Sequence, residues 1–310
     1  MNKFDVIIPS SKADIAIVKK NIYYIKKYIP CKNIIVITSS TCFNELEGVK
    51  TIDEDLVIEG MSIEIIRKIL KRRIGNDSRA GWYFQQFLKL GYCYLCLDEY
   101  YLIWDADTIP VRPFKLFDSL DRPYLTVKDL ELTSTYIPSL QAILGRMRLD
   151  NKTYIAEHLL FNVEITKCLI KFIQENSNLQ GEKFYEKILN SIPDNLLNES
   201  GFSEYETYAR FIKKYYADLY VERNVIAIGN AKKYVPVECP DDVLKWAAKS
   251  VELLTIENYE KQGVWSRLNR FGIIRFAISL KAEKELENFV TTYKGRIRTC
   301  IKLLRNLNKG

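Results

Sequence analysis

A strand, a helix and a second strand follow one another within the first 38 residues. Phe4–Pro9 is a short apolar run that ends in proline, and Asn33–Thr38 is a second run rich in β-branched residues. Between them, Asp14–Tyr28 carries apolar residues at helical spacing. A crossover of this length joins its two strands in parallel. We therefore expect an α/β protein with a mostly parallel sheet and flanking helices.

The alternation continues through the first half of the chain, and the second half is mostly helical. Further strands are predicted at Tyr101–Trp104, Tyr124–Val127 and Val225–Ile228. Helices are predicted at 62–73, 82–90, 163–176, 181–191, 203–216, 241–249 and 255–261. Because no linker rich in glycine or serine divides the chain, we expect one domain over residues 1–240. A helical C-terminal extension would then cover residues 241–310.

Composition excludes several classes of protein. Hydrophobic residues make up 47% and charged residues 27% of the 310 residues, as in soluble globular chains. The longest apolar runs are far shorter than the roughly 18 residues of a membrane span, and the N-terminus lacks a signal-peptide pattern. The seven cysteines are scattered and odd in number, which argues against a disulfide framework. The expected location is the cytoplasm.

The positive charge is concentrated at the C-terminal end. Residues 264–310 hold eleven Lys and Arg against three Glu, which gives this segment a net charge of +8. Since the whole chain has a net charge of +7, the first 263 residues together carry −1. In the last stretch, Lys294–Lys309, basic residues alternate with an apolar stripe and no acid occurs. A basic amphipathic helix is typical of attachment to an anionic membrane surface, here the inner face of the plasma membrane. A solvated terminal helix is the alternative, and no nucleic-acid-binding motif is present.

The most informative segment is the third strand with the residues that follow it. The apolar run Tyr101–Trp104 ends in Asp105-Ala106-Asp107, and Pro113-Phe114 comes shortly after. Open α/β sheets bind their ligands at the carboxyl ends of the strands. Two carboxylates delivered there, together with diphosphate oxygens, suit Mg²⁺ or Mn²⁺. Such a metal can neutralise a leaving diphosphate. An acidic surface turn is the alternative reading.

These segments resemble a known class of enzymes. Phe4–Ser10 and the strand that ends in Asp105–Asp107 resemble the nucleotide-sugar-dependent glycosyltransferases of the GT-A fold, which is Rossmann-like. Three further motifs, Gly81–Leu90, Glu157–Asn162 and Ser203–Tyr208, are similar to a bacterial family associated with surface-polysaccharide assembly. The resemblance covers about residues 3–235. It implies a nucleotide-binding half at about 1–128 and an acceptor half at about 129–240.

The resemblance also implies roles for single residues. Asp107 would ligate the metal directly, and Asp105 would lie beside the ribose or the metal. Pro9 and Ser10, with Lys12 nearby, would contact the nucleotide. Two further residues, Arg79 and Gln86, would bind a phosphate or another polar group of the donor. Each has a structural alternative; for example, Ser10 could simply cap the helix that begins near Lys12.

A general base is needed if transfer inverts the anomeric configuration. Glu204, at the first position of a predicted helix, is the expected base, and Glu206 is the second candidate. The pattern Ser203-x-x-Glu206 is also a capping box, in which Glu206 reaches back to the backbone N–H of Ser203. His158, the single histidine, is the third candidate, for substrate contact or proton transfer. It could equally be a core residue. A retaining reaction would need no separate base.

The expected function is therefore metal-dependent transfer of a sugar from a nucleotide-sugar, with UDP-sugar as the first choice. The acceptor would be a glycan or a lipid-linked glycan. One alternative is a sugar-nucleotide nucleotidyltransferase, although those enzymes carry a glycine-rich loop after the first strand and Pro9–Asp14 contains no glycine. Another is a membrane-recruited glycan-binding protein without catalysis. The sequence does not indicate the sugar, the linkage or the oligomeric state.

Overall fold

The computed structural model describes residues 4–46, 48–229, 231–233, 235 and 241–256. Two compact units divide this part of the chain. The first comprises residues 1–108 and 113–225 as far as they are described, and the second comprises residues 109–112 with the described residues from 226 onward. The boundary predicted after residue 240 falls at the edge of the undescribed stretch 236–240, and it stays a prediction. The basic tail lies outside the described residues.

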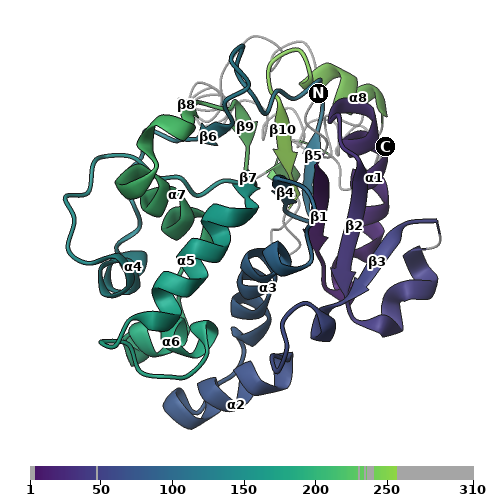
Figure 1. The fold of residues 1–310 in the computed structure, drawn as a ribbon. Coiled ribbons are helices and arrows are strands. Elements are labelled where there is room, and N and C mark those ends of the chain that lie inside the picture. Colours follow the sequence, from purple (N-terminus) through teal and green to yellow (C-terminus); the bar gives the residue numbers. More distant parts are fainter. Residues whose placement is uncertain (1–3, 47, 230, 234, 236–240, 257–310) are drawn as a thin grey trace, which may run out of the picture. The chain divides into compact units, whose positions relative to one another are not determined.

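A five-stranded sheet forms the centre of the first unit (Figure 1), in the order β3-β2-β1-β4-β7. The four strands β1, β2, β3 and β4 run parallel, and β7 is antiparallel to β4. Their bounds are β1 Asp5–Pro9, β2 Asn33–Thr38, β3 Lys50–Asp53, β4 Tyr100–Trp104 and β7 His158–Asn162. The α/β class with a mostly parallel sheet is thus confirmed. The βαβ unit predicted at the N-terminus is confirmed as β1, α1 and β2.

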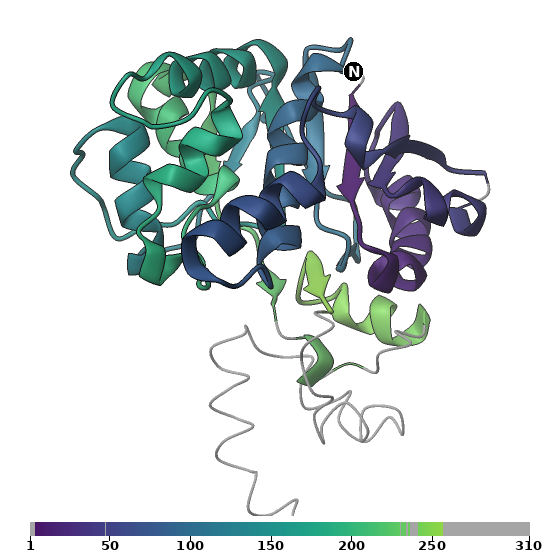
Figure 2. The same cartoon turned by 90° about the horizontal axis from the view of Figure 1, so that it is seen from below.

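Helices cover both faces of this sheet. They are α1 Ile15–Tyr28, α2 Ile63–Ile74, α3 Ala80–Gly91, α4 Ile137–Leu144, α5 Val163–Glu175, α6 Phe184–Ser191 and α7 Glu204–Tyr215. Alternate strand residues such as Ile7 and Ile103 share one apolar cluster with residues of α3, α5, α6 and α7. The intervening residues, such as Val6 and Ile8, are equally buried, and they point to the opposite face because side chains alternate along a strand. Figure 2 shows α1 and α3 on opposite sides of the strands.

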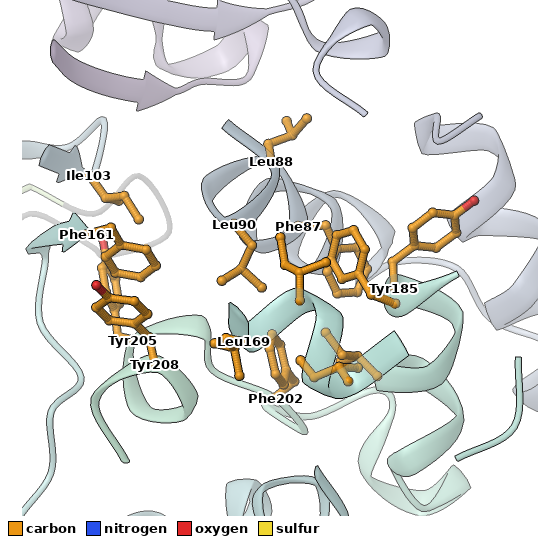
Figure 3. Packing of buried hydrophobic residues seen from close by; sticks show 14 of the residues in the cluster. Phe87, Leu88, Leu90, Ile103, Phe161, Leu169, Tyr185, Phe202, Tyr205 and Tyr208 are labelled. Atoms are coloured by element: carbon orange, nitrogen blue, oxygen red, sulfur yellow. The ribbon is translucent and has the colours of Figure 1, made fainter. Parts of the chain in front are cut away.

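Aromatic side chains fill the space between the sheet and α3, α5 and α7 (Figure 3). The ring of Tyr208 on α7 stacks on Phe161 of β7, with centroids 3.8 Å apart and planes 9° from parallel. The Tyr208 hydroxyl accepts from the backbone N–H of Asn162 and is hydrogen-bonded to the hydroxyl of Tyr220. Tyr220 in turn donates to the carbonyl of Leu160. Buried aromatic hydroxyls therefore bond α7 to the antiparallel edge strand.

Smaller sheets complete the described structure. In the first unit, β6 (Tyr124–Thr126) pairs in parallel with β8 (Val221–Arg223), so the strand predicted at Tyr124–Val127 exists but lies outside the main sheet. The second unit holds β9 (Ala227–Ile228), β10 (Leu253–Thr255), α8 (Asp241–Ala247) and all of β5 (Thr108–Pro110) except its first residue. Short 3₁₀ helices occur at 12–14, 40–46, 54–56, 92–94, 134–136, 194–196, 217–219 and 231–233.

The predicted elements need correction in two respects. The helix α4 and the strands β3, β5, β7, β8 and β10 were not predicted, and residue 255 ends a strand instead of beginning a helix. β7 escapes the helical pattern because its His158–Asn162 run leads directly into α5 without a turn. Residues 257–261 of that last predicted helix lie outside the described part. Among the described residues, no helix is long and apolar enough to cross a membrane.

Candidate active site

The carboxyl edge of the main sheet gathers most of the predicted site residues. The parallel strands β1, β2 and β4 end there at Pro9, Thr38 and Trp104. The loop Asp105–Asp107 follows β4 directly. Because β7 is antiparallel, it begins at the same edge, where His158 lies opposite Trp104. The topology thus brings Pro9, Asp105, Asp107 and His158 to one edge, which is where open α/β sheets bind ligands.

Hydrogen bonds fix the backbone of the acidic loop. The N–H of Asp105 donates to the carbonyl of Glu157 at 2.9 Å, which extends the pairing of β4 with β7. From α1, the buried amide of Asn21 donates to the carbonyls of Asp105 and Ala106, at 3.4 and 3.3 Å. The loop is therefore held both by the chain next to it in the sheet and by α1. The role of Asn21 was not expected from the sequence.

A buried ammonium group binds the first aspartate of the loop. The Nζ atom of Lys89 lies 2.6 Å from Oδ1 of Asp105 and 2.8 Å from Oε1 of Glu204. The hydroxyl of Tyr205 donates to the same Asp105 oxygen at 2.9 Å. The side chains of Lys89 and Glu204 are each 4% exposed, and that of Asp105 is 29% exposed. We call these four residues the Lys89 cluster.

The Lys89 cluster carries one positive and two negative charges. Burial by itself would lower the pKa of Lys89, but the carboxylates of Asp105 and Glu204 outweigh it and the pKa is raised. Lys89 is therefore charged. Burial raises the pKa of Glu204; Lys89 opposes this rise, and repulsion from Asp105 adds to it. The cluster has a net charge of −1 when both acids are ionised, which favours a cation at the exposed side of Asp105.

Sequence reasoning did not identify Lys89, although a signal was present. It is the only charged residue of α3, a helix made otherwise of apolar, aromatic and amide residues. A lysine at such a position must find a buried partner. Which partner it finds depends on how α3 packs against β4 and α7, and these contacts are distant in the sequence.

Glu204 does not point freely at a ligand, as the sequence suggested, because its carboxylate is buried against Lys89. Its backbone N–H donates to Oε1 of Gln86 at 3.1 Å, and Nε2 of Gln86 donates to the carbonyl of Trp82. Both ends of the Gln86 amide are thus bonded to the protein. Gln86 positions the start of α7 instead of presenting a free amide to the donor.

The capping interpretation of Ser203 is correct in one half. The Ser203 hydroxyl accepts from the N–H of Glu206, as expected for a helix cap. The carboxylate of Glu206, however, does not reach back to Ser203. It accepts from the N–H of Tyr154 at 2.8 Å and from Nε of Arg210 at 2.8 Å. Glu206 is 1% exposed, so it holds the chain before β7 against α7.

His158 is buried between aromatic side chains. Its ring lies 4.7 Å from that of Phe114 and 5.4 Å from that of Trp104, measured between centroids. Its Nε2 is hydrogen-bonded to the hydroxyl of Thr126 at 3.0 Å, and its Nδ1 is buried without a hydrogen bond. Burial lowers the pKa of His158 to about 3, and the charges of Lys128 and Arg223 contribute. The histidine is therefore neutral at physiological pH.

The residues expected at the nucleotide differ in their surroundings. Ser10 is buried at the end of β1, and its hydroxyl donates to the carbonyl of Ser11. Ser10 does not cap the following helical turn: Ser11 occupies the cap position before the 3₁₀ turn Lys12–Asp14, and its side chain makes no capping hydrogen bond there. Lys12 is exposed. At the neighbouring end of β2, the hydroxyl of Thr38 is buried and has no hydrogen bond within the described structure. Buried polar groups without a hydrogen bond are rare in folded proteins, so a ligand is a possible partner for this hydroxyl.

Arg79 lies at the start of α3. Its Nε donates to the carbonyl of Glu199 at 3.0 Å, and its Nη2 donates to the hydroxyl of Ser200. The guanidinium carbon lies 4.5 Å from the centre of the Trp82 ring. One face of Trp82 is thus covered by Arg79, and Arg79 itself braces the chain before α7. The structure gives it no contact with the acidic loop.

The donor set of the acidic loop suits a hard divalent cation. Oδ1 of Asp105 already accepts two hydrogen bonds, and none from the described residues reaches its Oδ2. Asp107 adds a second carboxylate. No group of three or more His, Cys, Asp or Glu side chains with ligand spacing occurs among the described residues. Two carboxylates leave most of the six or more oxygen positions that Mg²⁺ or Mn²⁺ requires to water and diphosphate oxygens.

Comparisons with known proteins give the following findings. The model of a family of unknown function (DUF6492) matches residues 1–142. No curated protein sequence matches the chain. Mouse xyloside xylosyltransferase 1 is similar in structure with a TM-score of 0.40 at 8% identity, over 83% of this chain and 98% of that one. The glycosyltransferase GlyE of Streptococcus pneumoniae TIGR4 has a TM-score of 0.36 at 13% identity, over 95% of this chain and 64% of that one. At these scores, neither likeness bears on the donor, the acceptor or the metal of this chain.

Proposed function

We propose that this protein is a metal-dependent glycosyltransferase that takes a sugar from a nucleotide-sugar, with UDP-sugar as the first candidate. The observation that carries the proposal is the position of Asp105 and Asp107 at the carboxyl end of a buried parallel strand. There, Lys89 and Tyr205 donate to one oxygen of Asp105, and no described residue donates to the other. A carboxylate held in this way is suited to binding a ligand that approaches from the sheet edge.

Mn²⁺ or Mg²⁺, held by Asp107 and by Oδ2 of Asp105, would neutralise charge on the diphosphate leaving group. The protein's own residues would orient the nucleotide. Ser10 directly follows β1, the strand next to β4, and Thr38 ends β2, the next strand along the sheet. Their hydroxyl groups would contact the base and the ribose. Exposed Lys12 would add a positive charge near the phosphates.

The proton of the acceptor hydroxyl needs a destination if transfer is inverting. Glu204 remains the proposed base, because burial and the neighbouring Asp105 raise its pKa and make it a better proton acceptor than an exposed glutamate. The ion pair with Lys89 holds one of its two oxygens. If transfer is retaining, no separate base is needed, and the role of Glu204 would be limited to its ion pair with Lys89.

The proposal also includes an acceptor and a location. The sequence motifs resemble those of proteins associated with bacterial surface polysaccharides, which suggests a glycan or a lipid-linked glycan as acceptor. The basic tail would place the enzyme on the anionic inner face of the plasma membrane.

The test is hydrolysis of nucleotide-sugars without an acceptor, measured as release of free sugar with Mn²⁺ or with EDTA. The proposal predicts slow, metal-dependent hydrolysis of one nucleotide-sugar. A parallel assay supplies a nucleoside triphosphate and a sugar-1-phosphate and measures pyrophosphate. Pyrophosphate release without hydrolysis would favour a nucleotidyltransferase instead. Neither activity, with glycan binding intact, would favour a non-catalytic glycan-binding protein.

A further inference from the structure

Lys89 connects the acidic loop to the start of α7 at the bottom of the proposed site. Its ammonium group contacts Asp105 and Glu204 at the same time, at 2.6 and 2.8 Å. We propose that Lys89 is a positioning residue, which fixes the Asp105 carboxylate in the orientation that binds metal and nucleotide. This inference rests on the proposed function, since it concerns the geometry of that same site.

The contacts of Asp105 show how the orientation is fixed. Lys89 and the hydroxyl of Tyr205 both approach Oδ1, from α3 and from α7. An aspartate side chain without such partners would populate several rotamers. Two donors on one oxygen select a single orientation, in which Oδ2 is left for a ligand. Preorganisation of this kind improves binding because less freedom is lost when the ligand arrives.

One hydrogen-bonding partner would be sufficient to bury Lys89 in the core, but the ammonium group contacts two carboxylates. The buried ammonium of Lys187 on α6 offers a comparison within the same chain. It is 7% exposed, and its Nζ donates to the carbonyl of Asn176 at 2.7 Å, with no carboxylate partner in the described part of the chain. Glu204 alone would neutralise Lys89. The additional contact with Asp105, on the loop that ends at the sheet edge, is the feature that points to positioning.

The test separates positioning from stability by balancing the buried charge. Lys89→Met alone would leave two carboxylates without a counter-ion, so the informative variant is Lys89→Met with Glu204→Gln. The single variant Glu204→Gln keeps Lys89 on Asp105 and serves as its parent. Lys187→Met removes a buried ammonium far from the acidic loop and serves as the matched control for lost stability.

The first measurement is the dissociation constant of UDP at saturating Mn²⁺, by titration calorimetry, with GDP as a second probe. We expect Glu204→Gln and Lys187→Met to stay within about threefold of the wild type, and the double variant to bind at least about tenfold more weakly. Lys187→Met should lose thermal stability while its affinity is unchanged. Equal affinity of the double variant and Glu204→Gln would overturn the inference.

The second measurement is a crystal structure of the double variant, which does not depend on the proposed function. We expect the Asp105 carboxylate to leave its present orientation or to occupy several. A carboxylate that stays within about 0.5 Å of its present position would overturn the positioning role. If the wild type binds neither nucleotide with Mn²⁺, the proposed function is wrong, and the crystal structure still decides whether Lys89 orients Asp105.

Discussion

The hydroxyl of Tyr205 donates to Oδ1 of Asp105 at 2.9 Å, across 100 residues of sequence. The preceding residue, Glu204, reaches the same ammonium of Lys89 that binds Asp105. Two consecutive side chains at the start of α7 are therefore tied to the loop after β4. A change at the start of α7 will be felt at the acidic loop, and the predictions below use this connection.

Glu204→Gln is expected to lower kcat by at least about 10²-fold, as removal of a general base usually does. Glutamine keeps the shape of the side chain and can still accept from Lys89, so the melting temperature should change little. Steady-state kinetics and thermal denaturation measure the two effects. Glu199→Gln, at an exposed position before α7, is the control and should behave like the wild type. An unchanged kcat in Glu204→Gln would exclude it as the base and favour retaining transfer.

Glu206→Ala is expected to cost about 1–3 kcal/mol of unfolding free energy. The change removes the acceptor of the Tyr154 N–H and of Nε of Arg210, although Arg210 keeps its ion pair with Asp150. Lys171 and Glu175 form an ion pair of the same i,i+4 spacing, with both side chains exposed. Glu175→Ala should therefore have little effect. Equal losses in chemical denaturation would contradict the structural role of Glu206.

His158 gives a pH dependence of stability. Its pKa in the folded protein is lowered to about 3, whereas an unfolded histidine titrates near 6.5. Below pH 6.5 the unfolded chain binds a proton at this histidine, whereas the folded chain does not, so stability is lost as the pH falls. Between pH 7.5 and 5 the loss amounts to about 2 kcal/mol.

The difference between wild type and His158→Gln isolates this contribution, because the chain contains one histidine. Urea denaturation at pH 7.5, 6 and 5 should show the two stabilities converging as the pH falls. Parallel curves would mean that the pKa of His158 is the same in the folded and the unfolded chain, and the neutral, buried assignment would then be wrong.

Sequence patterns were sufficient for the parts of the fold that depend on local periodicity. The parallel strands β1, β2 and β4 and the helices between them follow from apolar spacing alone, and so does the acidic loop at the end of β4. The antiparallel strand β7 could not be predicted in the same way. Its run His158–Asn162 is short and apolar, which fits a strand or a buried helical turn equally well.

The site was predictable in its residues but not in their partners. The sequence places Asp105 after a strand and Glu204 at a helix start. That Lys89 lies between them depends on the packing of α3 against β4 and α7, which no local pattern encodes. Likewise, the capping-box pattern correctly predicted the Ser203 cap, but the carboxylate of Glu206 bonds to Tyr154 and Arg210, which the pattern does not contain.

The most direct test of the central claim is titration calorimetry of UDP into the wild type and into Asp107→Ala, each with Mn²⁺ and with EDTA. The account predicts that the wild type binds UDP at least about tenfold more tightly with Mn²⁺ than with EDTA. It predicts that Asp107→Ala loses this metal dependence while its melting temperature stays near that of the wild type. Metal-dependent binding that survives in Asp107→Ala would contradict the claim that the acidic loop after β4 is the metal and nucleotide site.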